Sequence, residues 1–115
     1  MKKVTGDEYR ITYDQATATI EFTGSVRLLG ASSYGPIIDL LDEVVDMHPK
    51  NITLQLQDLP FLNSSGLTAL SKFVIRVRNE KQSQIIVYGT EKFPWQSKSL
   101  RNLQRLMPEL KLESA

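Results

Sequence analysis

The stretch Asn63-Ser64-Ser65-Gly66 separates a strand-like run from a helix-like run, and this junction decides how the whole chain is interpreted. Upstream, apolar and polar residues alternate from Ile52 to Gln57, which predicts a strand with one buried face. Downstream, apolar residues recur at the spacing of a helix with one buried side. These helical positions are Leu67, Leu70, Phe73, Val74 and Val77.

The junction has the chemistry of a helix start. Asn63 is a good N-cap, because the first backbone amides of a helix have no partners within it. Ser64 would then lie at the positive end of the helix dipole, where an added phosphate is well tolerated. Ser64 is therefore a candidate phosphorylation site, although a helix-start serine without chemistry is the simpler interpretation. Ser65 is the weaker candidate, since we expect its hydroxyl to make a structural hydrogen bond. Gly66 is expected to let the chain turn closely and to let another surface approach the backbone.

Length and composition predict one domain over residues 1–115, with a core from about residue 8 to 113. The apolar fraction of 41% is sufficient for a core, and the net charge of +1 provides no strong field to attract nucleic acid or an acidic membrane. The segment Met1–Glu8 lacks the apolar region of a secretory signal, and no run approaches the roughly 20 apolar residues of a membrane helix. We therefore expect a cytoplasmic protein without membrane insertion and without a nucleic-acid partner.

Periodicity and turn residues predict the order β-β-α-β-α-β-α, with a possible final strand. Residues 24–30 are expected to connect the second strand to the first helix. The predicted strands are 9–13, 16–23, 52–57, 84–88 and a short one near 110–112, and the predicted helices are 36–48, 64–79 and 96–107. Strand-helix-strand crossings predict a single α/β domain, in which a mixed sheet carries helices mainly on one face.

Two apolar runs in the second half of the chain have particular interpretations. The nearly continuous run Ile85-Ile86-Val87 predicts a strand that is buried on both faces. Phe93-Pro94-Trp95 precedes the last helix, and either packs beneath it as a hydrophobic staple or extends a partner surface.

The sequence offers little catalytic machinery. It has no cysteine, which excludes thiolate chemistry and disulfides, and its single histidine is His48, near the end of the first helix. No glycine-rich phosphate-binding motif and no Gly-x-Ser-x-Gly elbow are present. We therefore expect no enzyme activity, cofactor or metal. A serine hydrolase is the distant alternative, and it would require His48 to lie beside Ser64.

The segment Leu56-Gln57-Asp58-Leu59-Pro60-Phe61-Leu62-Asn63-Ser64-Ser65-Gly66-Leu67 resembles the signature of the STAS domain, the fold of bacterial anti-sigma-factor antagonists. In that family a strand ends, an apolar pair follows, and an Asp-Ser-Ser-Gly-Leu turn begins a helix. The predicted order of elements and the length are similar too, so the resemblance covers essentially the whole chain. Phe22-Thr23-Gly24 also falls where that family has a turn after its second strand.

The resemblance implies a regulator that works by partner switching in transcription control. Its partners would be an anti-sigma factor that is also a serine kinase and a PP2C-type phosphatase, and its phosphorylated serine corresponds to Ser64. The implied partner-binding residues are Asp58, Asn63, Ser64, Ser65, Gly66, Leu67 and Thr68.

Two positions differ from the family pattern. Asn63 replaces the aspartate, which preserves the helix cap but removes a negative charge beside Ser64. Gly24-Ser25-Val26-Arg27 lacks the acidic pair that antagonists often carry after the glycine, which is consistent with a different partner. The alternative is therefore a STAS scaffold or sensory-complex subunit that binds without phosphorylation.

Overall fold

The computed structural model describes residues 2–114 and arranges six strands in chain order within one sheet. The first three strands are antiparallel, and each of the last three runs parallel to its neighbour. The strands are β1 (Lys2–Thr5), β2 (Tyr9–Asp14), β3 (Thr19–Val26), β4 (Asn51–Leu62), β5 (Gln84–Gly89) and β6 (Lys111–Ser114). This mixed sheet confirms the predicted fold class, including the final strand.

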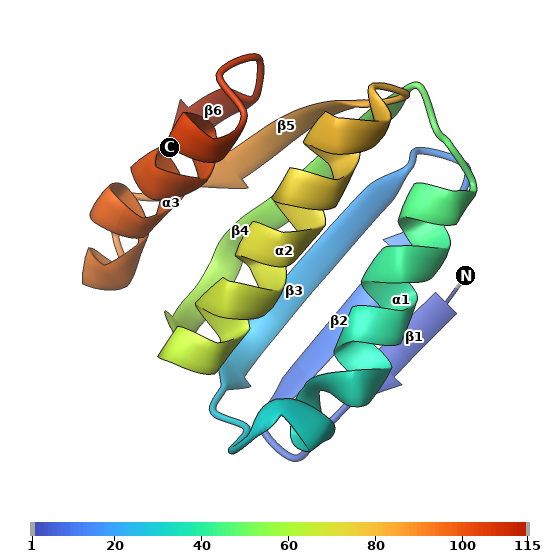
Figure 1. Cartoon of the computed structure of the whole chain (residues 1–115). Coiled ribbons are helices and arrows are strands. Elements are labelled where there is room, and N and C mark those ends of the chain that lie inside the picture. The colour runs from blue at the N-terminus through green and yellow to red at the C-terminus, as the bar shows by residue number, and fades with distance from the viewer. Residues whose placement is uncertain (1, 115) are drawn as a thin grey trace.

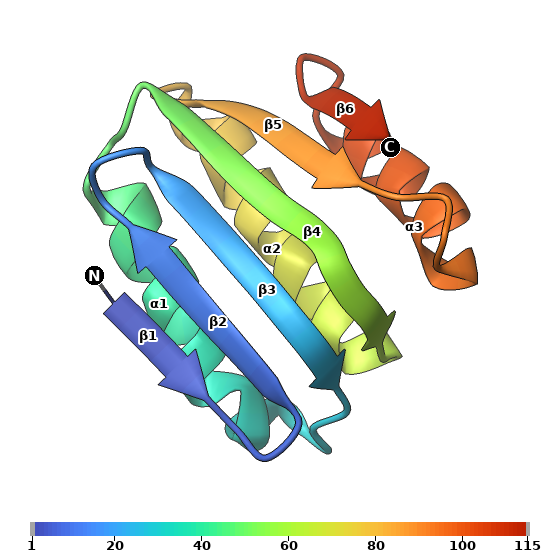
Figure 2. The ribbon, with the colours of Figure 1, turned by 180° about the vertical axis from the view of Figure 1, so that it is seen from behind.

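All three α-helices within residues 2–114 cover the same face of the sheet (Figure 1), and in this range the opposite face carries no helix (Figure 2). A short 3₁₀ turn, η1, leads into the first helix. The helical elements are η1 (Ala31–Tyr34), α1 (Gly35–Asp46), α2 (Ser64–Glu80) and α3 (Pro94–Leu106). The core lies between the helices and the sheet, so the predicted packing on one face is confirmed. Within residues 2–114, no helix combines the length and apolar character needed to cross a membrane.

The edge strand β1 was not predicted from the sequence. Lys2, Lys3 and Thr5 are exposed and only Val4 is partly buried, so the segment has no alternating apolar pattern. Its backbone nevertheless pairs with β2 in register from Lys2 to Thr5. Exposed lysines on an outer strand also discourage pairing with another chain.

Strand β3 continues through the first three residues of the predicted connection, to Val26. The chain passes close to the β1–β2 turn at this point, and the Ser25 amide donates to the Glu8 carbonyl at 2.9 Å. Gly24 has a φ of 87°, and a Cβ there would lie 3.0 Å from the Cα of Tyr9. Only glycine meets both requirements easily, which allows the strand to extend.

Strand β4 is about twice as long as predicted because two irregularities change its period. Its pairing with β3 shifts after Glu21 and again after Thr23, which places an extra residue in β4 each time. Leu56, Leu59 and Leu62 are consequently all buried at intervals of three residues. Alternation at every second position, from which the end of the strand was predicted, cannot detect such bulges.

The far part of β4 extends past the end of β5, as Figure 2 shows, and helix α3 provides its hydrogen-bond donors. Gln96 is fully buried, and its Nε2 donates to the carbonyls of Leu56 at 2.7 Å and Leu59 at 3.2 Å. Trp95 Nε1 also donates to the Leu59 carbonyl, at 2.9 Å. Because Trp95 is partly buried against the core, the packing interpretation holds for this residue.

Strand β5 differs from its predicted burial. Ile85 and Val87 are fully buried beneath the helices, whereas Ile86 between them is only half-buried on the open face. The continuous apolar run therefore does not indicate cover on both faces. Three consecutive β-branched residues suit an extended strand regardless of which face is covered.

Candidate functional site

The turn between β4 and α2 is a capped helix start. Asn63 has extended backbone angles (φ −80°, ψ 176°), and its Oδ1 accepts a hydrogen bond from the Gly66 amide at 3.0 Å. Its carbonyl accepts from the Leu67 amide at 3.0 Å, which is the first hydrogen bond of the helix. The predicted capping role of Asn63 is present in the structure.

The side chain of Asn63 also joins two other segments to this turn. Its Nδ2 donates to the Leu28 carbonyl at 2.9 Å, and its Oδ1 accepts from the Tyr34 hydroxyl. Its backbone amide donates to the Val26 carbonyl at 3.2 Å. Tyr34 is almost fully buried, and burial raises the pKa of its phenol above the ordinary value of 10.0. Sequence periodicity contained no signal for Tyr34 or for the Leu28 carbonyl.

Ser64 and Ser65 are both exposed in the first turn of α2. Within residues 2–114, neither hydroxyl makes a hydrogen bond, so the structural hydrogen bond expected for Ser65 is not formed. Thr68 is exposed one turn later, and its Oγ1 donates to the Ser64 carbonyl at 3.0 Å. The turn thus presents two available hydroxyls beside backbone amides at the positive end of a helix.

Gly66 has a different role from the one expected. It is buried within α2, and a Cβ there would lie 2.8 Å from Leu62 Cγ and 3.1 Å from the Tyr34 hydroxyl oxygen. The missing side chain therefore makes room for the protein's own core rather than for an approaching surface. Its φ is not in the positive range, so the requirement is for space.

The remaining sequence-predicted residues lie at different distances from the turn. Leu67 is partly buried and packs against the core, which limits what it can offer to a partner. Asp58 is exposed on β4, five residues before Asn63. At about 3.3 Å per strand residue, the two can be as much as roughly 16 Å apart. The structure brings together residues 63–68 but places Asp58 outside this group.

The surface around the turn includes features that the sequence did not identify. A shallow groove of about 140 Å³ runs between α1 and α2 and is lined by Tyr34, Ile38, Ser65, Thr68, Ala69 and Lys72. Leu29 follows the residue whose carbonyl Asn63 contacts and is 84% exposed, and Phe61, two residues before Asn63, is 39% exposed. The guanidinium of Arg27 lies 4.9 Å from the centre of the Phe61 ring. Exposed apolar side chains next to a helix start are typical of contact surfaces.

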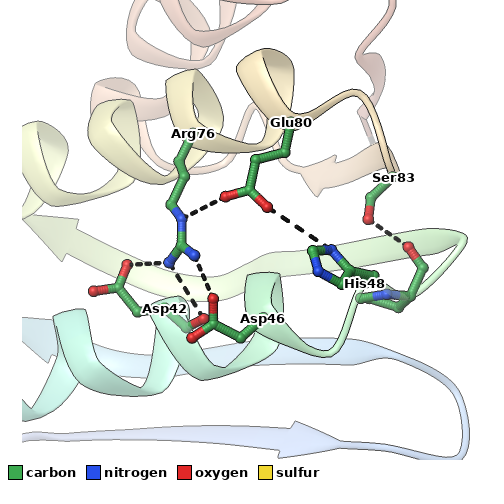
Figure 3. Close-up of polar contacts among 7 residues, drawn as sticks. Asp42, Asp46, His48, Arg76, Glu80 and Ser83 are labelled. Carbon is green, nitrogen blue, oxygen red and sulfur yellow. Dashed lines mark hydrogen bonds and ion pairs between the residues drawn. The ribbon is translucent and has the colours of Figure 1, made fainter.

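The other end of the α1–α2 pair is held by charge (Figure 3). Arg76 on α2 binds Asp42 at 3.0 Å, Glu80 at 2.8 Å and also Asp46. Hydrogen bonds to Asp46 and Glu80 raise the pKa of Arg76 above its ordinary value. His48 Nδ1 lies 3.8 Å from the second carboxylate oxygen of Glu80.

This arrangement separates His48 from the serine turn. His48 faces Glu80, the last residue of α2, whereas Ser64 is the first. Sixteen residues of helix at about 1.5 Å each place these two ends roughly 24 Å apart. The His48–Ser64 pair that a serine hydrolase would need is therefore absent, and His48 is half-exposed rather than packed in the core.

The fold is that of a STAS-like domain, as predicted from the sequence. A search of solved structures finds a chain in the complex of the diguanylate cyclase SiaD with its activator SiaC from Pseudomonas aeruginosa, with a TM-score of 0.76, 11% identity and full coverage of both chains. SiaC of Pseudomonas aeruginosa gives a TM-score of 0.69 and 13% identity, with 100% of this chain and 97% of that chain covered.

An anti-sigma factor antagonist from Mycobacterium paratuberculosis gives a TM-score of 0.58 and 18% identity, covering 96% of this chain and 82% of the other. No protein-family model and no curated protein matches the sequence. The similarity is therefore one of fold, and at these identities it carries no information on the site residues.

Proposed function

We propose that this chain is a regulatory binding protein of the anti-sigma-factor-antagonist kind, and that residues 1–115 act as one binding domain. It works by partner switching rather than by catalysis, without a cofactor. The proposed contact residues are Asp58, Asn63, Ser64, Ser65, Gly66, Leu67 and Thr68. Gly66 and Leu67 contribute mainly by shaping the turn, because their own atoms are buried or partly buried.

The observation that carries the proposal is the exposed Ser64 hydroxyl at the start of a capped helix. A phosphate on Ser64 adds about −1.5 to −2 charges at neutral pH. The helix amides stabilise such a charge internally, so the fold is retained. A partner surface that fits the neutral turn would instead lose complementarity, and the complex would dissociate.

The proposed partners are an anti-sigma factor that is also a serine kinase and a PP2C-type phosphatase, in the cytoplasm. The test is intact-mass measurement after incubation with ATP and each serine-kinase anti-sigma factor of the source organism. We expect the mass of one phosphate on the wild type and on Ser65→Ala, but none on Ser64→Ala. Phosphate on Ser64→Ala but not on Ser65→Ala would move the site to Ser65, which has the same free hydroxyl.

A second candidate function keeps the fold and omits the phosphate: a scaffold, a sensory-complex subunit or a protein activator of an enzyme. Two observations favour it, the neutral Asn63 beside Ser64 and the fold similarity to a chain from the complex of SiaD with its activator SiaC. Under this alternative, Ser64→Ala would bind a partner and respond to it as the wild type does.

A further inference from the structure

One amide side chain connects three segments at the serine turn. Asn63 Oδ1 faces two donors, the Gly66 amide at 3.0 Å and the Tyr34 hydroxyl, whereas its Nδ2 faces the Leu28 carbonyl at 2.9 Å. One branch of the side chain must therefore accept hydrogen bonds while the other branch donates one. Among the residues that commonly cap helices, only asparagine carries an acceptor and a separate donor on the two branches of one side chain at neutral pH.

An ionised aspartate at this position would satisfy only half of these contacts. It would accept from Gly66 and Tyr34 as asparagine does, so the helix cap would remain. Its second oxygen would face the Leu28 carbonyl, and two acceptors at hydrogen-bond distance repel each other. The aspartate typical of the fold's signature would therefore start the helix without holding the segment before η1.

That segment, residues 27–30, carries exposed features of the surface around the turn. Leu29 is 84% exposed, and Arg27 stacks on Phe61. Gly30 has a φ of 80°, and a Cβ at this position would have no neighbouring heavy atom within 4 Å. The Leu28 side chain is partly buried against the core, and the hydrogen bond from Asn63 to the Leu28 carbonyl adds the polar contact that fixes the backbone of this segment beside the serine turn.

Building on the binding role proposed above, we propose that Asn63 is a positioning residue that holds residues 27–30 against the serine turn. Leu29 and Ser64 are then presented together on one rigid surface. The amide of Asn63, in place of a carboxylate, is what makes this arrangement possible. The difference from the family's aspartate is accordingly a structural feature of the contact surface.

The groups around position 63 allow a pH test of this role. The titratable side chain that contacts Asn63 is Tyr34 of η1, and burial raises its pKa further above the range used. Arg27 is the charged side chain on the connected segment. Wild-type Asn63 does not titrate, so any acid-dependent change in Asn63→Asp that the wild type lacks comes from the new carboxyl group.

The experiment measures backbone ¹⁵N order parameters in the wild type, Asn63→Asp and Asn63→Ser, from pH 7.5 down to pH 3.5. Serine at position 63 caps the helix but has no second polar group for Leu28, so it is the matched control. At pH 7.5 we expect order parameters of about 0.85 for residues 28–30 in the wild type and below about 0.6 in both variants. On acidification only Asn63→Asp recovers, because a protonated carboxyl group can donate to the Leu28 carbonyl.

Rigid residues 28–30 in Asn63→Asp at pH 7.5 would overturn the proposal. So would a folded Asn63→Asp in which the carboxyl ¹³C shift shows that position 63 is protonated while residues 28–30 stay mobile. If a variant does not fold, the proposal can still be tested by a measurement on the wild type alone. A scalar coupling between the Asn63 side-chain nitrogen and the Leu28 carbonyl carbon is expected, and its absence would also overturn the proposal. None of these results depends on a kinase, so failure here is distinct from a failure to phosphorylate Ser64.

Discussion

At the N-terminal end of α2, one neutral side chain joins three segments, whereas near the C-terminal end one cation joins three carboxylates. Asn63 makes its contacts through hydrogen bonds to Gly66, Leu28 and Tyr34. Arg76 makes its contacts through ion pairs to Asp42, Asp46 and Glu80, whose side chains are 30–64% exposed. The two ends of the same helix are thus fixed by different forces.

The difference indicates which end can accept a new negative charge. Near Ser64 an added phosphate meets the helix amides and a network of uncharged groups. Near Arg76 it would meet three acidic side chains and the negative end of the helix dipole. Because the hydrogen bonds of Asn63 join uncharged groups, we expect the turn to accept a phosphate without losing them.

The largest effect is expected from removing the Tyr34 ring. Tyr34→Ala should lower the free energy of unfolding by about 3–5 kcal/mol, because a large buried aromatic side chain leaves a cavity. The matched variant Tyr34→Phe keeps the ring and loses only the hydrogen bond to Asn63, at a cost of about 0.5–1.5 kcal/mol. Urea unfolding followed by circular dichroism measures both. Equal losses would mean that the hydroxyl, and not packing, carries the contribution of Tyr34.

The next largest effect is expected from filling the space at Gly66, near the N-terminal end of α2. Gly66→Ala should destabilise the protein by about 1–3 kcal/mol, since the new methyl group meets Leu62 in a packed core. Thr68→Ala, on the exposed side of the same helix, should remain within about 0.5 kcal/mol. Thermal unfolding of the two variants makes the comparison. A stabilised Gly66→Ala would show that helix propensity outweighs the contact with Leu62.

Alkaline pH should lower the stabilisation that Tyr34 provides at the N-terminal end of α2. Because burial raises the pKa of this phenol in the folded state, its contribution is present below pH 10 and is lost as pH rises through the folded pKa. The stability advantage of the wild type over Tyr34→Phe should therefore shrink above pH 10. Tyr13, whose pKa burial also raises, is common to both proteins and cancels in the difference. An advantage that is constant to pH 11.5 would contradict this effect.

The charged end should respond to salt instead. Arg76→Met removes the cation and leaves Asp42, Asp46 and Glu80 facing one another, so it should lower the melting temperature at low ionic strength. The loss should diminish in 1 M NaCl, because these groups are partly exposed and therefore screened. Because hydrogen bonds raise the pKa of Arg76, this side chain stays charged in alkaline solution, and the difference in melting temperature between the wild type and Arg76→Met should not change there. A loss that does not depend on salt would indicate packing of the side-chain stem.

The smallest effect is expected for a negative charge on the serine turn itself. Ser64→Asp should raise the free energy of unfolding by about 0.3–1 kcal/mol at low salt, through the helix dipole. Ser64→Asn has nearly the same shape without the charge, and it should stay at the wild-type value. This gain in the free energy of unfolding should disappear in 1 M NaCl, because salt screens the charge at an exposed helix end. A destabilised Ser64→Asp would indicate that the turn does not tolerate a phosphate.

Periodicity predicted the elements whose burial follows a regular spacing, such as α2 with Leu70 and Val77. It failed where backbone pairing alone makes the structure, as in β1, and where bulges changed the period, as between Leu56 and Leu62. At the site, turn chemistry identified the cap of Asn63, because capping is a local interaction. The contacts of Asn63 with Tyr34 and Leu28 span 29 and 35 residues of sequence, and no local pattern encodes them.

Within residues 2–114, the far part of β4 has no neighbouring strand on the β5 side, and side chains of helix α3 bind its carbonyls there. Beyond Gln55 the carbonyls of Leu56 and Leu59 are satisfied by Gln96 and Trp95 rather than by a strand. A chain shortened before Phe93 would expose these carbonyls beside an apolar surface, in the geometry that recruits strands from other molecules. We therefore expect helix α3 to hinder self-association at the strand that ends in the serine turn.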